Sequence, residues 1–138
     1  MEFSIKEYEA YHEEEILPLY ESVGWTNYTQ KPQMLNEAYL HSLKSYAAYV
    51  GNKLVGIIRV VGDGVSVVFV QDLLVYPQYH RQGIGTALLK KIMEEYDGVY
   101  QLHLLTENTE KTIAFYKSLG FLMDTDIECR AFSKYCVG

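Results

Sequence analysis

The stretch that decides the expected fold is residues 73–89, LLVYPQYHRQGIGTALL. An apolar strand runs into a proline-containing loop, and Gly83-Ile84-Gly85 then open an amphipathic helix. Two glycines let the backbone approach a ligand closely, and the free N–H groups of the first helical turn face that ligand at the positive end of the helix dipole. The stretch therefore predicts an anion site suited to phosphate.

Two common nucleotide motifs do not fit this glycine turn. A Walker A loop needs Gly-Lys-Ser/Thr, whereas Gly85 is followed by Thr86-Ala87. A dinucleotide fingerprint needs a third glycine where Leu88 stands, and it needs a parallel βαβ unit around the turn. A plain helix start after a loop remains the alternative to a phosphate site.

The segment before the turn predicts an antiparallel meander. Three apolar runs, 45–50, 54–61 and 65–76, are separated by Gly51-Asn52 and by Gly62-Asp63-Gly64. Glycine, Asn and Asp supply the positive φ angles that tight hairpins require. The last of these strands leads directly into the glycine turn.

The rest of the chain alternates helices with short strands. A proline is accepted in the first turn of a helix but not in its interior, so we expect the first helix to restart or kink at Pro18. The expected helices are 12–23, 32–43, 84–97 and 109–119, and the expected further strands are 3–6, 99–105, 121–123 and 128–132. Residues 25–30 are expected to form a loop. The pattern predicts a mixed α/β sheet in a single domain over residues 1–138.

Composition excludes several classes of protein. The chain has 138 residues, 49% of them hydrophobic and 22% charged, which argues against disorder. Its formal net charge of −6 disfavours a nucleic-acid partner. Seven of the 18 acidic residues fall in the first 21 positions, where they form either a solvated helix face or a field that attracts cationic ligands.

Cysteine and histidine usage predicts neither disulfides nor a metal site. The two cysteines, Cys129 and Cys136, lie near the C-terminus, and the four histidines lack metal-ligand spacing. The first 15 residues are acidic, and no apolar run reaches the ~20 residues of a membrane span. We therefore expect a cytoplasmic protein with no membrane partner.

The glycine turn and a second segment resemble the GCN5-related N-acetyltransferase (GNAT) family. His80-Arg81-Gln82-Gly83-Ile84-Gly85 is similar to the family's Gln/Arg-x-x-Gly-x-Gly/Ala signature, with His80 at its first position. Residues 109–121, TEKTIAFYKSLGF, are similar to Asn-x-x-Ala-x-x-x-Tyr-x-x-x-Gly-Phe, with Tyr116, Gly120 and Phe121 in register. Thr109 stands at the family's Asn position. The similarity covers nearly the whole chain.

The resemblance implies an acyl-CoA N-acyltransferase fold, with a largely antiparallel central sheet flanked by about four helices. It implies acetyl-CoA as cofactor, CoA as product and no metal. Main-chain amides that would bind the pyrophosphate belong to Arg81, Gln82, Gly83, Ile84, Gly85 and Thr86. The pantetheine arm would lie beside Leu73, Leu74 and Val75, where a bulge would free an N–H for the thioester carbonyl, and Thr109 could donate its hydroxyl to that arm.

The expected chemistry is direct attack of an amine on the thioester, since no convincing Cys–His pair is present. Tyr116 is the candidate acid for the leaving thiolate, because a phenol can donate a hydrogen bond to sulfur and the family has its usual acid there. The alternative is a core tyrosine on the helix face that Ile113 and Leu119 share.

Asp72 stands inside an otherwise apolar run, where an unpaired carboxylate would be costly. It either pairs with a cation such as Arg59 or acts as the base, as a glutamate does in some family members at the matching position. Glu107 or water alone are the other candidates for the base.

Trp25 and Tyr28 are the candidate acceptor contacts, since aromatic side chains in a loop can bind cations through their π faces; a core role for Trp25 is the alternative. The leading hypothesis is an N-acetyltransferase that acts on a primary amine of a small molecule or protein. A non-catalytic acyl-CoA sensor and a general nucleotide-binding protein are the competing hypotheses, and a homodimer is the family-level expectation.

Overall fold

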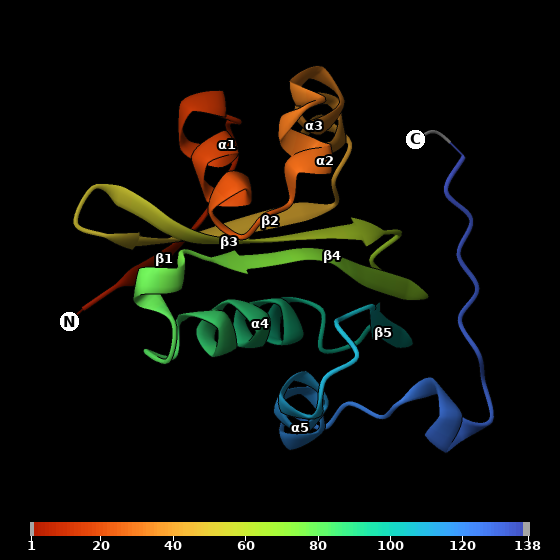
Figure 1. Cartoon of the computed structure of the whole chain (residues 1–138). Helices are drawn as coiled ribbons and strands as arrows, with labels where there is room; N and C mark the ends of the chain where they lie inside the picture. The colour runs from red at the N-terminus through yellow and green to blue at the C-terminus, as the bar shows by residue number, and fades with distance from the viewer. Residues whose placement is uncertain (1, 137–138) are drawn as a thin grey trace. The chain divides into compact units, whose positions relative to one another are not determined.

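The strands form one five-stranded sheet in the order β1-β2-β3-β4-β5 in the structure, a computed structural model that describes residues 2–136 (Figure 1). The first four strands pair antiparallel, and β5 runs parallel to β4. Their bounds are Ser4–Glu7 (β1), Lys44–Val50 (β2), Lys53–Gly62 (β3), Val67–Val75 (β4) and Gln101–Leu104 (β5). The predicted meander and the mixed α/β class are confirmed.

The turn between β3 and β4 follows from two residues. Gly62 has φ +128°, and a Cβ there would lie 2.4 Å from the carbonyl oxygen of Val67, so only glycine fits. Asp63 then organises the turn, because its Oδ1 accepts hydrogen bonds from the amides of Val65, Ser66 and Val67 at 2.8, 2.8 and 3.1 Å. This turn sets the start of β4 and, through it, the strand that precedes the glycine turn.

Helices cover both faces of the sheet within residues 2–104. The helices α1 (Glu13–Ser22), α2 (Thr26–Thr29) and α3 (Pro32–Leu40) lie on one face, and α4 (Ile84–Glu95) lies on the other (Figure 1). Pro32 at the start of α3 fits the preference of proline for the first helical turn.

Two helix predictions differ from the structure, and a third is narrowed. Of the two alternatives at Pro18, the restart is excluded because Pro18 lies inside α1, and the kink stays a prediction. Residues 25–30 are not all loop, because α2 forms one short helical turn there. The helix that begins at Pro32 ends at Leu40 and not at Leu43.

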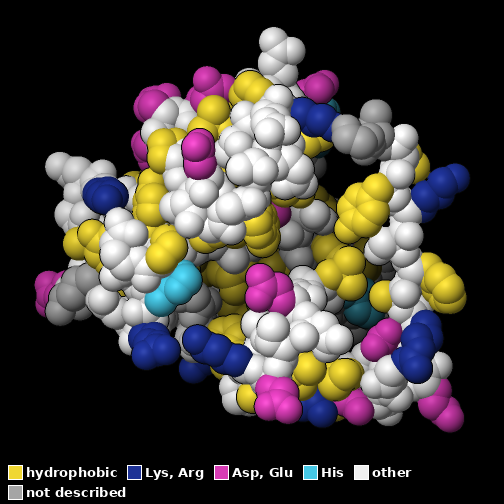
Figure 2. All heavy atoms as spheres, viewed as in Figure 1, with side chains coloured by type: hydrophobic (Ala, Val, Ile, Leu, Met, Phe, Trp, Pro, Cys, Tyr) yellow, Lys and Arg dark blue, Asp and Glu magenta, His cyan; other side chains and the backbone are white. Residues whose placement is uncertain are grey.

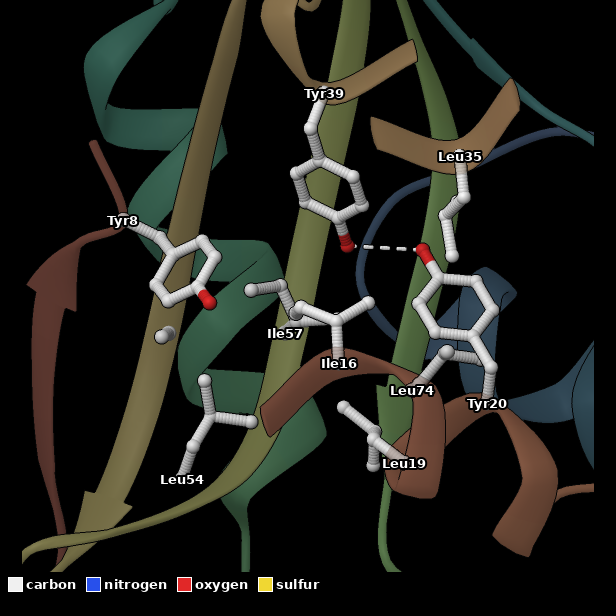
Figure 3. Packing of buried hydrophobic residues seen from close by; sticks show 10 residues of the cluster. Tyr8, Ile16, Leu19, Tyr20, Leu35, Tyr39, Leu54, Ile57 and Leu74 are labelled. Carbon is white, nitrogen blue, oxygen red and sulfur yellow. Dashed lines mark hydrogen bonds between the residues drawn. The ribbon is translucent and has the colours of Figure 1, made fainter. Parts of the chain in front are cut away.

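A tyrosine-rich core fills the face covered by α1 and α3. Tyr20 and Tyr39 point toward each other from the two helices, and their hydroxyls are joined by a hydrogen bond of 2.9 Å (Figure 3). The other buried members of this cluster are Tyr8, Ile16, Leu19, Leu35, Ala47, Leu54, Ile57 and Leu74. Three of the 13 tyrosines, Tyr8, Tyr20 and Tyr39, are therefore buried in this core, and the hydroxyl of each has a hydrogen-bond partner.

The chain divides into two units at Leu104, and the second unit is described here over residues 105–136. Their helix α5 spans Glu110–Ser118, and a 3₁₀ turn spans Asp124–Ile127. The two strands predicted over 121–123 and 128–132 are wrong. The single-domain expectation stays a prediction.

The missing strands have a local cause. Asp126 Oδ2 accepts from the amide of Met123, and Asp124 Oδ2 accepts from the amide of Ala131, both at 3.0 Å. Side-chain bonds of this kind occupy backbone groups that a sheet ladder would use. Glu128, with φ +59°, interrupts the extended conformation as well.

Among residues 2–136, no helix has the length and apolar character that a membrane crossing requires.

Candidate functional site

The second half of β4 has an open edge. Strand β5 pairs with β4 only from Val67 to Val70, and no other strand of residues 2–136 pairs with β4 on that side. The amide of Tyr76 donates to Val55 across the β3 side, so by antiparallel alternation the backbone groups of Leu73 and Val75 face away from β3. Two of the three residues predicted to flank the pantetheine arm thus offer backbone groups at this edge.

Leu74, the third of these residues, has a different position. Its side chain is 3% exposed and belongs to the tyrosine-rich core. Its backbone alternates with that of Leu73 and Val75 and so faces β3. Leu74 therefore holds the strand in place and presents no group to the open edge.

A bulge interrupts β4 at Gln71. Arg59 of β3 pairs with Asp72, but the next residue, Val60, pairs with Val70, so Gln71 is the extra residue. The bulge expected among residues 73–75 is present two residues earlier. It lies just beyond Val70, where the pairing with β5 ends.

The loop after β4 is held by His80. A 3₁₀ turn, Pro77–Tyr79, follows the strand, and His80 Nε2 lies 2.8 Å from the carbonyl oxygen of Val75. This contact closes the loop onto the strand end and uses one of the outward-facing carbonyls. The sequence did not indicate this contact of His80 with the end of the strand.

The start of α4 presents unused amides. Gly83 has φ +81° and precedes the helix, and Arg81 also has a positive φ of 65°. Of the backbone hydrogen bonds between elements in residues 2–136, none has its N–H donor between Arg81 and Thr86. All six predicted pyrophosphate contacts lie here, at the positive end of α4, which favours an anion.

Gly56 on β3 brings α4 close to the sheet. A Cβ at this position would lie 3.1 Å from the carbonyl oxygen of Leu74 and 3.3 Å from side-chain carbons of Ile84 and Leu88. The absence of a side chain therefore sets the distance between the first turn of α4 and the strand. The sequence signal was a glycine inside an apolar strand, which typically marks close approach.

Asp72 is buried in a network of polar side chains. It is 1% exposed, and its Oδ2 accepts from Arg59 Nε at 2.7 Å and from the Tyr20 hydroxyl at 2.6 Å. Since Tyr20 donates to Asp72, Tyr39 donates to Tyr20. The predicted pairing of Asp72 with Arg59 is confirmed, and the base role of Asp72 stays a prediction.

Electrostatics follow from this burial. Burial alone lowers the pKa of Arg59, but the charge of Asp72 and the hydrogen bond to it more than offset that, so the net pKa is raised. Burial, with Tyr39 and Asp72 nearby, raises the pKa of Tyr20 well above its ordinary value. Tyr20 thus stays protonated and keeps donating to the carboxylate.

The sequence did not single out Tyr20 or Tyr39 as members of this network. Their only signal was helical spacing, Tyr20 with Ile16 and Tyr39 with Leu35.

Trp25 and Tyr28 are half-buried and pack on Tyr20. Their ring centroids lie 6.1 and 5.3 Å from that of Tyr20, and Gln71 Nε2 donates to the Tyr28 hydroxyl at 3.4 Å. Trp25 therefore packs against the core, as the alternative reading held, while keeping part of its ring accessible. The two candidate acceptor contacts are brought together with the bulge residue Gln71.

The network borders a cavity of about 290 Å³. Tyr39 and Ser42 line it, and Ser42 Oγ also accepts from Arg59 at 3.2 Å. The other lining residues come from β1, β2, their neighbouring loops and the end of α3, and none is a predicted cofactor or acceptor residue.

Within residues 105–136, Tyr116 lies half-buried on α5. Its ring contacts those of Phe115 and Phe121, with centroids 4.9 and 5.8 Å away. Burial raises the pKa of Tyr116 above its ordinary value of 10, and a hydrogen bond with Thr106 offsets part of that rise. At neutral pH the phenol is therefore protonated.

The hydroxyl of Thr109 caps α5. It accepts from the amide of Thr112 at 3.2 Å and lies 2.9 Å from that residue's hydroxyl. The hydroxyl of Thr112 also donates to the carbonyl oxygen of Glu107 at 2.6 Å. The cofactor role of Thr109 and the base role of Glu107 stay predictions.

Candidate metal ligands are dispersed in the part of the chain that the structure describes. No three His, Cys, Asp or Glu side chains of residues 2–136 come together to hold an ion. Both cysteines are exposed and free. The groups offered at the β4 edge and the start of α4 are backbone amides and carbonyls, which suit an organic anion with amide groups.

Comparisons with known proteins identify a family for this sequence. The sequence model of the family described as "Acetyltransferase (GNAT) domain" matches residues 41–122. The chain is 28% identical over 101 residues to serotonin N-acetyltransferase 2, chloroplastic, of Oryza sativa subsp. japonica, covering 70% of this chain and 50% of that protein. It spans about 34% to 60% of the length of the curated relatives it matches.

Solved structures share the fold. A GNAT family acetyltransferase of Streptococcus pneumoniae is 45% identical, with a TM-score of 0.89, and the match covers 97% of this chain and 98% of that one. AAC(6′)-Iy in complex with the bisubstrate analogue CoA-S-monomethyl-acetylneamine is 17% identical, with a TM-score of 0.75 over 99% and 100% of the two chains, which shows the fold alone. The expected acyltransferase fold is confirmed, and the chain belongs to the GNAT family of acetyltransferases.

Proposed function

We propose that this protein transfers the acetyl group of acetyl-CoA to a primary amine. The observation that carries the proposal is one continuous segment, residues 71–86, that joins an open strand edge to unused helix amides. The pyrophosphate binds the amides of residues 81–86. The pantetheine arm has amide groups of its own and pairs with the backbone of Leu73 and Val75 as an added strand does.

The reaction is a direct transfer. The amine nitrogen attacks the thioester carbonyl carbon, the C–N bond forms, and the C–S bond breaks with its electron pair going to sulfur. Backbone N–H groups at the bulge stabilise the carbonyl oxygen as it gains charge. Tyr116 donates a proton to the departing thiolate, and its raised pKa keeps that proton available at neutral pH. The attacking nitrogen loses a proton to solvent as the amide forms, and solvent returns one proton to the phenolate of Tyr116.

The ammonium form of the acceptor must lose a proton before attack. Asp72, Glu107 and water are the three candidates for receiving it. Asp72 is enclosed, with Oδ2 bonded to Arg59 and Tyr20, so a proton would reach it only through a change in that network. Direct loss to water needs no such change.

The acceptor is proposed to contact Trp25 and Tyr28. Their rings offer π faces to a cation, and acidic side chains gather over α1, whose first turn carries Glu13, Glu14 and Glu15 (Figure 2). A cationic amine, on a small molecule or a protein, fits this surface better than an acidic substrate.

Replacing Tyr116 by phenylalanine tests the chemical step. The Tyr116→Phe change removes the proton donor and keeps the ring, so we expect kcat to fall at least about tenfold while the Kd for acetyl-CoA stays within about twofold. Tyr100→Phe, at a side chain that is 81% exposed, is the matched control. Thiol release is the readout, with the acceptor found in an amine-library screen. An unchanged kcat would remove Tyr116 from the mechanism.

The same screen separates the enzyme from an acyl-CoA sensor. A sensor binds acetyl-CoA but releases no thiol with any amine. Acetyl-CoA binding with amine-dependent thiol release supports the transferase, and binding without release across the library supports the sensor.

A further inference from the structure

The Arg59–Asp72 ion pair lies at the β-bulge of β4. Arg59 and Asp72 are the last cross-strand partners before the register shift, and Gln71, the extra residue, follows directly. Both charged side chains are almost fully buried, at 4% and 1% exposure. The pair therefore stands at the one irregular step of the β3–β4 ladder.

Stability alone is a poor reason for this pair. Removing two charges from water costs free energy, and apolar residues of similar volume often stabilise a core as much as a buried ion pair does, or more. Asp72 Oδ1 is buried without a hydrogen-bond partner among the described residues, which adds to that cost. The best attested use of such buried polar groups is to select one register over its alternatives.

The register at this step decides which groups reach the open edge. A shift of one residue turns every side chain and every backbone group of a strand to the other side. Without the bulge, the backbone groups of Leu73 and Val75 would face β3, and Leu74 would leave the core. The amides that the proposed function assigns to the pantetheine arm depend on the extra residue at position 71.

Tyr20 links the same carboxylate to the acceptor contacts. Its hydroxyl donates to Asp72 Oδ2 at 2.6 Å, and its ring packs on Tyr28, which accepts from Gln71. The charged pair, the bulge and the aromatic contacts thus form one connected set of side chains, with Tyr20 and Tyr39 shown together in Figure 3.

We propose that Arg59 and Asp72 are positioning residues that hold the β4 bulge, and with it the cofactor edge and Tyr28, in the register that the reaction needs. This inference rests on the proposed function. It assigns Asp72 a geometric role that does not require its carboxylate to take a proton from the acceptor.

The test uses a neutral pair that keeps the geometry. In the Arg59→Gln/Asp72→Asn double variant, the Nε2 of glutamine takes the place of arginine Nε, and the asparagine oxygen takes the place of Oδ2. We expect this variant to keep the Gln71 amide resonance at its wild-type position and to retain at least about tenfold more kcat/KM than Asp72→Ala, with the pH profile of wild type. Asp72→Ala should lower kcat/KM at least about thirtyfold and shift the backbone amide resonance of Gln71.

The two roles of Asp72 predict opposite results for the double variant. A base cannot be replaced by an amide, so loss of activity equal to that of Asp72→Ala, with a native Gln71 resonance, would overturn the positioning role. An unchanged Gln71 resonance and unchanged acetyl-CoA affinity in Asp72→Ala would overturn it as well.

Folding is followed by circular dichroism and thermal midpoint in each variant. If Asp72→Ala fails to fold, Tyr20→Phe replaces it, since it removes one bond to Oδ2 and should shift the Gln71 resonance in the same direction by a smaller amount. A native Gln71 resonance in that variant would contradict the proposal. The resonance is measured without substrates, so failure of the proposed transferase activity is seen separately, as absence of thiol release by wild type.

Discussion

Gly83 shows how one residue controls the proposed phosphate turn. A Cβ at this position would meet no atom within 4 Å, so space is not the constraint. The backbone has φ +81°, a region that β-branched residues avoid and that asparagine accepts more readily than most. Conformation, and not crowding, therefore restricts this position.

Two substitutions at Gly83 separate these effects. Gly83→Val should weaken acetyl-CoA binding at least about tenfold, because valine pulls the backbone away from the left-handed region and turns the amides from the pyrophosphate. Gly83→Asn should keep the Kd within about threefold. Isothermal titration calorimetry measures both. Equal, near wild-type affinity in the two variants would mean that the pyrophosphate lies elsewhere.

At the scale of elements, the β3–β4 turn depends on one exposed carboxylate. Asp63 accepts from the Ser66 hydroxyl at 2.6 Å and from three backbone amides. The Ser66 bond first, and then the amide bonds, lower the pKa of Asp63 well below its ordinary range. The turn is thus tied to the ionised form of this side chain.

The sign of the pH effect follows from linkage. A carboxyl group whose folded pKa is depressed contributes stability above its unfolded pKa of ~4, and this contribution is lost as pH falls toward the folded value. The gap in thermal midpoint between wild type and Asp63→Asn should therefore be larger at pH 7 than at pH 3. Glu110→Asn, at an exposed side chain of α5, is the control. A gap of the same size at both pH values would show that ionisation of Asp63 does not matter.

For the whole molecule, ligand binding is coupled to unfolding. A ligand that binds only the folded chain stabilises it by about 2.7 kcal/mol at a hundredfold excess over Kd. For 138 residues this corresponds to a rise in thermal midpoint of roughly 9 °C.

Acetyl-CoA and CoA should produce that rise, whereas ATP and NAD should not, because the glycine turn lacks the lysine and the third glycine of the nucleotide motifs. Differential scanning fluorimetry over a ligand series is the measurement. A shift with ATP or NAD as large as that with acetyl-CoA would favour a general nucleotide-binding protein over a GNAT-type cofactor site.

Patterns of short range in the sequence predicted much of the fold. Alternation of apolar residues and turn glycines predicted the meander, and the Gly83-Ile84-Gly85 turn predicted the start of α4. An aspartate within an apolar strand indicated a buried partner, and Arg59 was named as its candidate. Each of these predictions rests on residues that are close in sequence, or on strands that short turns bring together.

Two further features depend on residues distant in sequence. The bulge at Gln71 arises from the pairing of β4 with β3, and the Tyr20–Tyr39 contact arises from the docking of two helices on one sheet face. The C-terminal strands were predicted from local pattern, but local side-chain bonds took the backbone groups instead.

The sequence by itself determined the order of the strands and of the longer helices up to α5, and the glycine turn, because these follow from periodicity and from the conformational freedom of particular residues. The family was indicated by the similarity of residues 80–85 and 109–121 to the motifs of that family. Only the tertiary structure decided which backbone groups of β4 face outward and what surrounds Asp72. A one-residue change of register leaves the sequence pattern of a strand intact while reversing both of its faces, so that choice is made by partners across the sheet.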